Sequence, residues 1–279
     1  MEIFYEIKPL RAFLKAKQRH LFTIGLVPTM GALHEGHLEL IRTSRSQNDI
    51  TICSIYVNPT QFNNAVDLEK YPRTLASDKE KLEKAGCDVI FAPSNEEMYQ
   101  RTSEIGFDVG EIGSVLEGEF RPGHFNGVAQ VVCKLFNIIQ PSRAYFGQKD
   151  FQQYKVIEKL VDELQFDIQL TSVPIFRERS GLAMSSRNQR LNENEKEKAT
   201  VFYQSLLVAS ELLKKGEQFI TVKNKVKQMC EATPNVKLEY IEWVDTKNLK
   251  PVQNVSNESI LLIAGYVGDV RLIDNLLLE

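Results

Sequence analysis

The sequence predicts an α/β fold in which a doubly wound parallel sheet is followed by a smaller C-terminal α+β domain. Short apolar, β-rich runs alternate with amphipathic stretches from about residue 23 to residue 173. This alternation is typical of βαβ units, and runs that are apolar throughout indicate strands buried on both faces of a sheet. After Pro174 the order changes to two helices and then three strands. We therefore expect one domain over residues 1–176 and a second over residues 177–279.

The elements of the first domain follow from local composition. The run ITICSIYV from residue 50 to residue 57 is rich in β-branched residues, as strands are. Gly86 ends a charged helix in the manner of a C-terminal cap, and Pro141 stops another helix. The expected strands are residues 23–28, 50–57, 87–91, 144–146 and 166–173, and the expected helices are residues 36–47, 74–85, 127–139 and 151–164.

The second domain begins with a long helix that has clear start and stop signals. Asn192, Glu193 and Glu195 are capping and first-turn residues, and Gly216 ends the pattern. The expected helices are residues 192–215 and 219–231, and the expected strands are residues 237–244, 259–264 and 270–273.

Composition excludes several classes of protein. The 279 residues are 43% apolar and 25% charged, as in ordinary globular proteins, and the net charge of −3 gives no general attraction to nucleic acid or to an anionic membrane. No apolar stretch approaches the ~18 residues of a membrane helix, and charges interrupt the first 17 residues, where a signal peptide would be apolar. The four cysteines are scattered, without a CxxC pair. We expect a cytoplasmic protein without nucleic-acid or membrane partners.

The segment VPTMGALHEGH, residues 27–37, joins the first expected strand to the first expected helix. The free N–H groups and dipole of a helix N-terminus favour a phosphate, and Gly31 and Gly36 allow close approach of a ligand. His34 and His37 can point the same way and donate hydrogen bonds to phosphate oxygens. Two alternatives are surface histidines that cap a helix and a zinc site. The spacing is one residue short of HExxH, so we expect no metal site, and both GxGxxG and the Walker motif are absent.

Three further segments contain side chains suited to a polar, phosphorylated substrate. FGQKD (residues 146–150) supplies Lys149 as a point charge and Asp150 as an acceptor from ribose hydroxyls or a helix cap, with Gln153 one turn further on. MSSR (residues 184–187) offers a cation and two hydroxyls on a loop, although it is also typical of a Ser-rich linker. NPTQF (residues 58–62) offers amides that suit hydroxyl and carboxylate groups, although Asn-Pro alone indicates a turn.

These segments resemble those of known enzymes. HxGH after the first strand, together with MSSR, resembles the HxGH motif and KMSKS-type loop of the nucleotidylyltransferase superfamily, which implies a Rossmann-like first domain. VPTMGALHEGH, NPTQF, YPRTLASD, RPGHFNGV, GQKDFQQ and GLAMSSRN occur in the order found in the pantoate–β-alanine ligase family, and RLIDN (residues 271–275) is similar to its C-terminal segment. The sequence is thus identified as a member of that family over about residues 20–190.

The resemblance implies a reaction and its partners. The family condenses D-pantoate with β-alanine to give pantothenate, using ATP, through a pantoyl-adenylate intermediate, and releases AMP and pyrophosphate. Mg²⁺ is expected to travel with the ATP phosphates, and the family's members suggest a homodimer formed through the first domain.

The resemblance also implies roles for individual residues. His37, which the family description treats as a proton donor, His34 and Lys149 would be catalytic, and an imidazole hydrogen bond to phosphate would serve without net proton transfer. Gln61 and Gln153 would bind pantoate, with Gln61 also near β-alanine, and Asn58 is a weaker candidate for the amine. Gln148 stands where relatives often have an acidic residue, so we expect no catalytic role for its side chain, and the roles of Asp78, Arg121 and His124 stay open. The expected ATP-binding residues are Met30, Gly31, Ala32, Leu33, His34, Glu35, Gly36, His37, Gly147, Gln148, Lys149, Asp150, Phe176 (mainly through its backbone), Met184, Ser185, Ser186 and Arg187.

Two rival functions are compatible with parts of this pattern. One is a nucleotidylyltransferase that leaves AMP on its product, but the amides of Asn58, Gln61 and Gln153 favour an acyl substrate. The other is a catalytically silent nucleotide-binding module, which predicts losses among charged and histidine positions that this sequence has kept.

Overall fold

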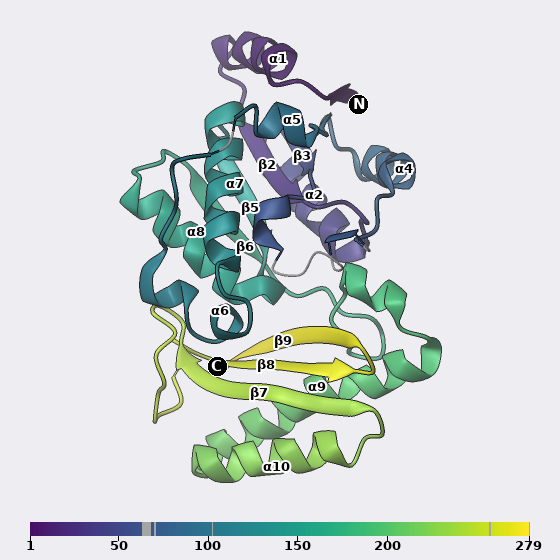
Figure 1. The fold of residues 1–279 in the computed structure, drawn as a ribbon, viewed down its shortest axis with the longest axis vertical. Coiled ribbons are helices and arrows are strands. Elements are labelled where there is room, and N and C mark those ends of the chain that lie inside the picture. The colour runs from purple at the N-terminus through teal and green to yellow at the C-terminus, as the bar shows by residue number, and fades with distance from the viewer. Residues whose placement is uncertain (63–67, 70, 102, 257, 279) are drawn as a thin grey trace. The chain divides into compact units, whose positions relative to one another are not determined.

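The computed structural model describes residues 1–62, 68–69, 71–101, 103–256 and 258–278 (Figure 1). The chain divides into two compact units. Unit 1 comprises Met1–Gln148 and Gln152–Pro174, and unit 2 comprises Lys149–Phe151 and Ile175–Glu279. The short segment Lys149–Phe151 therefore packs with the second unit, although both of its neighbours in sequence belong to the first.

Unit 1 contains a six-stranded sheet in the order β1-β4-β3-β2-β5-β6, and every neighbouring pair is parallel. The predicted Rossmann-like α/β class is confirmed. Two predicted strands start later than expected, at Val89 and at Gln169. The strands are β1 (Glu2–Phe4), β2 (Ile24–Thr29), β3 (Ile50–Ile55), β4 (Val89–Phe91), β5 (Arg143–Gly147) and β6 (Gln169–Val173).

The order of the strands reverses between β2 and β5. The chain proceeds from β2 outward through β3 and β4 on one side, and then returns to β5 on the other side, where Leu26 pairs with Ala144. In open α/β sheets, ligands bind outside the carboxyl ends of the strands at such a switch point. β2 ends at Thr29 and β5 ends at Gly147, so the HxGH segment and the GQKD segment both begin at this position.

Helices cover both faces of this sheet, and alternate strand residues face opposite sides. Leu26 and Ile52 join the core beneath α1, α7 and α8, whereas Val27 and Cys53 join a second core beneath α2 and α4. Figure 1 shows helices on both sides of the strands. The helices of unit 1 are α1 (Ile7–Arg19), α2 (Glu35–Gln47), α4 (Leu75–Ala85), α5 (Asn95–Met98), α6 (Glu117–Phe120), α7 (His124–Ile139) and α8 (Phe151–Glu163).

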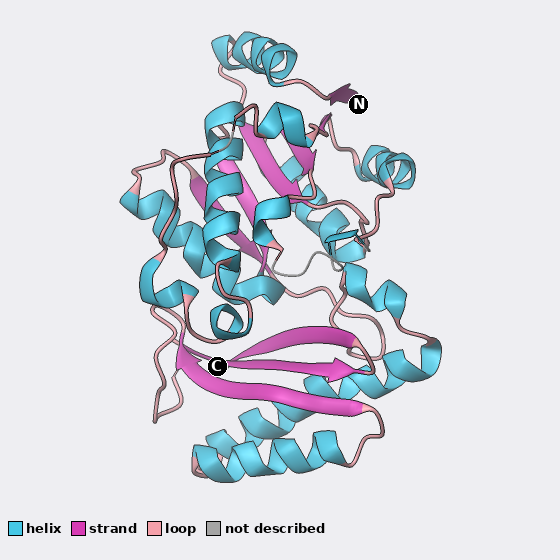
Figure 2. Cartoon of the chain, viewed as in Figure 1, coloured by secondary structure: helices cyan, strands magenta, loops and turns pink. Residues whose placement is uncertain are grey.

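Unit 2 is a three-stranded antiparallel sheet, β7-β8-β9, with two helices packed on it (Figure 2). The predicted capping residues start α9: Asn192 Oδ1 accepts from the backbone N–H of Glu195 at 2.9 Å, and Glu195 Oε2 accepts from the backbone N–H of Asn192 at 2.9 Å. β8 and β9 run further than predicted because they stay paired along their whole length, through Gly265 and Asn275. The elements are α9 (Glu193–Lys214), α10 (Phe219–Glu231), β7 (Val236–Asp245), β8 (Ser259–Val267) and β9 (Val270–Leu278).

Within the residues given above, the structure contains no helix with the length and apolar character needed to cross a lipid bilayer.

Candidate active site

The loop between β2 and α2 is held in an uncommon conformation by a buried carboxylate. Gly31 (φ +82°) and Ala32 (φ +51°) are both left-handed, which is unfavourable for Ala32. Asp78, in the first turn of α4, is fully buried; its Oδ2 accepts from the N–H of Ala32 at 2.9 Å and its Oδ1 accepts from the N–H of Leu33 at 2.8 Å. Lys81 donates to the carbonyl of Leu33 at 2.7 Å. Asp78, whose role the sequence leaves open, therefore fixes the backbone of the predicted ATP loop.

His34 and His37 lie together at the N-terminus of α2. Their ring centroids are 4.0 Å apart and their planes are inclined by 34°, which confirms the predicted proximity. The backbone N–H of His34 donates to Nδ1 of His37 at 3.4 Å. A donor at Nδ1 favours the neutral tautomer that has its proton on Nε2. In this tautomer Nε2 of His37 is a hydrogen-bond donor.

The first turn of α2 supplies main-chain N–H groups rather than an acidic side chain. The carboxylate of Glu35 forms an ion pair with Arg42, two turns along the same helix, at 2.9 Å, and both side chains are about half exposed. The groups that Glu35 and Gly36 can offer to a phosphate are therefore their backbone N–H groups.

Gln61 connects the segment after β3 to the ATP loop. It ends a short 3-10 helix (Pro59–Gln61), is buried, and its amide nitrogen lies 2.9 Å from Sδ of Met30. The buried ring of His124 lies 2.7 Å from the carbonyl of Gln61 through Nδ1, and since a carbonyl only accepts, this nitrogen is the donor. His124 therefore positions Gln61, and its own backbone N–H is bonded to the carbonyl of Arg121 at 3.0 Å.

Asn58 has a structural role that the sequence did not reveal. Its side chain is 1% exposed. Nδ2 donates to the carbonyl of Gly127 at 3.1 Å and to Thr60 Oγ1 at 3.0 Å, and Oδ1 accepts from the hydroxyl of Tyr99 at 3.0 Å. These bonds hold the residues before Gln61 against α7, so the hypothesis that Asn58 binds the β-alanine amine loses its support.

The polar side chains of the segment after β5 differ in burial and in hydrogen-bond partners. Lys149 is mostly buried, its Nζ lies 4.0 Å from Oδ1 of the half-exposed Asp150, and its carbonyl accepts from Asn275 at 3.0 Å. Gln152 is buried and binds the carbonyls of Ile112 and Val115 as well as the N–H of Glu117. Gln153, the predicted pantoate residue, is half-buried and stays a candidate.

In unit 2, a backbone bridge joins Phe176 to the start of the MSSR segment (residues 184–187), both of which are predicted to bind ATP. The N–H of Met184 donates to the carbonyl of Phe176 at 3.0 Å, next to the bridge between Arg177 and Ala183. Ser185 Oγ accepts from the N–H of Arg187 at 3.2 Å and caps the short helix Ser186–Arg190. The hydroxyl of Ser185 can still donate a hydrogen bond. The carbonyl of Phe176 already accepts one from Met184.

The parallel sheet, its switch point and the histidine pair at the start of α2 define an enzyme of the Rossmann-like α/β class that acts on a phosphorylated substrate. Comparison with known proteins identifies the family within this class. The profile of the family described as Pantoate-beta-alanine ligase matches residues 2–277, and the chain belongs to this family. It is an enzyme that condenses pantoate with β-alanine using ATP, so the two rival functions are set aside.

Full-length relatives support this assignment. The chain is 50% identical to the pantothenate synthetase of Aquifex aeolicus over 98% of this chain and 97% of that one, and 45% identical to that of Caldicellulosiruptor bescii over 100% and 99%. It superimposes on the crystal structure of the enzyme from Thermus thermophilus with a TM-score of 0.94 at 38% identity, covering 100% and 99% of the chains. The ligase from Francisella tularensis, crystallised with β-γ ATP and β-alanine, gives a TM-score of 0.81 at 37% identity, covering 99% and 97%.

Proposed function

We propose that the chain makes pantothenate in two steps through an enzyme-bound pantoyl adenylate. In the first step a carboxylate oxygen of pantoate attacks the α-phosphorus of ATP, and the bond from that phosphorus to the bridging oxygen breaks, so that pyrophosphate leaves with the electron pair. In the second step the amine of β-alanine attacks the acyl carbon, the acyl C–O bond to AMP breaks, and a proton is lost from nitrogen. Activation is needed because a carboxylate is a poor electrophile and AMP is a good leaving group.

The observation that best supports this proposal is the histidine pair at the N-terminus of α2, beside the switch point of the sheet. Charge develops on the phosphate oxygens as the α-phosphorus is attacked, and preorganised donors stabilise that charge. His37, with its proton on Nε2, and His34 would donate to these oxygens, together with the backbone N–H groups of residues 30–36. A hydrogen bond is sufficient for this role, so no net proton transfer is required.

The remaining predicted residues complete the ATP and substrate sites. Lys149, with Gly147, Gln148 and Asp150, would bind the phosphates and ribose, and Phe176 would contact the nucleotide. Arg187, with the hydroxyls of Ser185 and Ser186 and the backbone of Met184, would neutralise the leaving pyrophosphate. Gln61, whose amide adjoins Met30, and Gln153 would bind the hydroxyl and carboxylate groups of pantoate, and Gln61 would also adjoin β-alanine.

Mg²⁺ would enter as MgATP, bound to the phosphate oxygens. Among the residues that the structure describes, no three His, Cys, Asp or Glu side chains are close enough to hold a metal ion. Mg²⁺ keeps several waters and is commonly bound through substrate phosphates with few protein ligands, so a dedicated protein cage is not required.

The chain would have two working domains, with residues 1–176 binding ATP and pantoate and residues 177–279 acting as a lid; the compact units differ from this division at residues 149–151 and 175–176. We place the enzyme in the cytoplasm. The four cysteines all fall within the described residues and form no disulfide, as expected of a reducing compartment.

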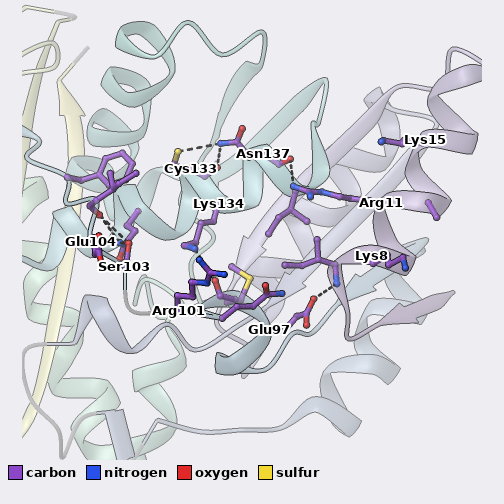
Figure 3. A pocket seen from close by; sticks show the side chains of 18 residues that line it. Lys8, Arg11, Lys15, Glu97, Arg101, Ser103, Glu104, Cys133, Lys134 and Asn137 are labelled. Carbon is purple, nitrogen blue, oxygen red and sulfur yellow. Dashed lines mark hydrogen bonds between the residues drawn. The ribbon is translucent and has the colours of Figure 1, made fainter.

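A groove on unit 1 supports the expected homodimer. It has a volume of about 1110 Å³ and lies between α1, α5, α7 and the extended chain that follows α5 (Figure 3). Ile105, on that extended chain, has a side chain that is 77% exposed. Lys8, Arg11 and Arg101 line the groove together with Glu97, so the surface contains both charges. In a two-fold interface the same patch meets itself, so these opposite charges could pair across the axis.

Light scattering tests the dimer. We expect the mass of two chains for the wild type and of one chain for Ile105→Glu, with the same circular dichroism spectrum. A wild-type enzyme that is monomeric at every concentration would overturn the proposal.

Mass-resolved product analysis tests the reaction, with MgATP, D-pantoate and β-alanine each omitted in turn. We expect AMP and pantothenate from the full mixture, and pyrophosphate release that requires pantoate but not β-alanine. Pyrophosphate release without pantoate, or a product that retains AMP, would contradict the two-step scheme.

The histidine assignment is tested by comparing His37→Ala with His20→Ala, which changes an exposed histidine at the end of α1. Loss of adenylate formation in the first variant alone is expected. Equal activity of the two variants would remove His37 from the site.

A further inference from the structure

Two consecutive residues of β9, Asp274 and Asn275, contact both of the segments that unit 2 contributes to the proposed ATP site. The side chain of Asp274 binds Arg177, which lies between Phe176 and the GLAMSSRN motif. The side chain of Asn275 binds the carbonyl of Lys149 at 3.0 Å. The two segments are far apart in sequence, and both contacts lie within unit 2.

The contact with Arg177 is two-pronged and largely buried. Its guanidinium donates to Oδ2 of Asp274 at 2.6 Å and to Oδ1 at 2.9 Å, and the two side chains are 17% and 6% exposed. The same guanidinium donates to the carbonyl of Gly181 at 3.1 Å and lies 3.7 Å from the ring centroid of Tyr203 on α9. Planar bidentate pairs of this kind fix orientation as well as position. Arg177 therefore holds both ends of the turn at residues 177–181.

Strand geometry explains how one dipeptide reaches both segments. Successive residues of a strand point to opposite faces. Leu272 and Leu278 pack in the core beneath the helices of unit 2, so Asp274 shares that face and Asn275 lies on the other. Asn275 is 1% exposed, and its backbone N–H donates to Oδ1 of Asp274 at 2.8 Å. Both side chains are thus fixed to one rigid strand that is paired along its length with β8.

We propose that Asp274 and Asn275 are positioning residues of the adenylation step. They fix the position of the backbone of Lys149 relative to the backbone bridge between Phe176 and Met184. This inference rests on the proposed assignment of Lys149, Phe176 and residues 184–187 to ATP. Small displacements of binding groups from productive geometry can cost as much as about 100-fold in rate. Loosening this connection should therefore impair the use of ATP more than the use of β-alanine.

The protein contains a matched control on the same strand. Arg271, three residues before Asp274, pairs with Glu239 on β7, and the side chains are 17% and 13% exposed. This ion pair has nearly the same burial as the Arg177–Asp274 pair, and Glu239 lies on β7 rather than in either segment of the proposed site. Glu239→Gln therefore measures what the loss of a largely buried ion pair does to unit 2 alone.

The test compares Asp274→Asn, Asn275→Ala and Glu239→Gln. The measurements are melting temperature, KM for each substrate, and ATP–pyrophosphate exchange with pantoate. We expect all three variants to have a lower melting temperature than the wild type. The first two should raise the KM for ATP and slow the exchange reaction by about 10- to 100-fold, with little change in the KM for β-alanine. Glu239→Gln should leave the KM for ATP unchanged. If Asp274→Asn behaves as Glu239→Gln does, the role is only structural and the inference is wrong.

Two further variants keep the test decisive. If Asp274→Asn does not fold, Arg177→Lys is used instead, because it keeps the charge but loses the bidentate geometry; an unchanged KM for ATP in that variant would refute the inference. Lys149→Ala tests the assignment of Lys149 to the ATP site, on which the inference rests. An unchanged KM for ATP in Lys149→Ala would overturn the proposed ATP site itself. A raised KM there, with none in the Asp274 and Asn275 variants, would overturn only the positioning role.

Discussion

Asp78 offers the sharpest test of how the ATP loop is held. Asp78→Asn keeps the shape of the side chain, but only one of its two terminal atoms can then accept a hydrogen bond. One of the two backbone N–H groups, of Ala32 or of Leu33, would face an NH₂ group in a fully buried position. A buried donor left without an acceptor costs about 1–3 kcal/mol. Asp78→Ala leaves both donors without an acceptor, so its cost should be about 2–6 kcal/mol.

These costs translate into measurable changes. For a chain of this size, about 2–4 °C of melting temperature is lost per kcal/mol, so Asp78→Asn should melt about 2–12 °C below the wild type. The loop can also open locally while the sheet stays folded, because only Asp78 and Lys81 hold it from α4 in the hydrogen bonds described above. We therefore expect a raised KM for ATP even well below the melting temperature. Differential scanning fluorimetry and steady-state kinetics with varied ATP measure the two effects.

Asp49→Asn is the matched control. Asp49 also accepts from a backbone N–H and a hydroxyl, both of Thr23, at 2.8 and 2.7 Å, but it is exposed and lies at the opposite end of β2. It should lower the melting temperature much less and leave the KM for ATP unchanged. The reasoning fails if Asp78→Asn melts and binds ATP as the wild type does, or if the two variants behave alike.

Three other predictions concern residues around the site and in the core. Gln153→Ala should raise the KM for pantoate more than that for ATP, and the reverse order would remove Gln153 from the pantoate site. Gly127→Ala should lower the melting temperature and weaken pantoate binding, because its new Cβ would lie 2.2 Å from the carbonyl oxygen of Thr60. If neither property changes, the segment around Thr60 moves to accommodate the new Cβ and the prediction is wrong. Burial raises the pKa of Cys87 to about 12, so at pH 8 it has far less thiolate than a free cysteine. Mass spectrometry after iodoacetamide treatment should find the half-buried Cys133 labelled first, and early labelling of Cys87 would contradict this.

Much of the fold could be predicted from local patterns because the strands of a doubly wound sheet are apolar throughout. The strands at Ile24–Thr29 and Ile50–Ile55 and the helix at Phe219–Glu231 lie within a few residues of their predicted positions. β1 and α1 were not predicted. β1 has only three residues, and α1 (Ile7–Arg19) exposes most of its charged residues, burying only Leu10 and Leu14 fully.

The parts of the site that were missed depend on contacts between residues distant in sequence. Asp78 binds the N–H groups of residues 45 and 46 positions earlier, and Arg177 binds a carboxylate 97 positions later. No local pattern distinguishes such residues from exposed charges. The structural bonds of Asn58, a weaker candidate for the β-alanine amine, were missed for the same reason, since its partners Gly127 and Tyr99 come from later segments. The motif RLIDN indicated that its residues matter but not what they contact.

The contact between Asn275 and Lys149 also has a consequence for how the protein is made. The two residues are separated by 126 positions, so at about 5–20 residues per second Asn275 is added to the growing chain about 6–25 s after Lys149. During that interval the sheet of unit 1 can already form around β5, because its last strand, β6, ends at Val173. The backbone of Lys149 nevertheless acquires this partner only after β9 has been synthesised. An incomplete chain that lacks β9 can thus have a folded parallel sheet and still lack this connection to the proposed ATP site.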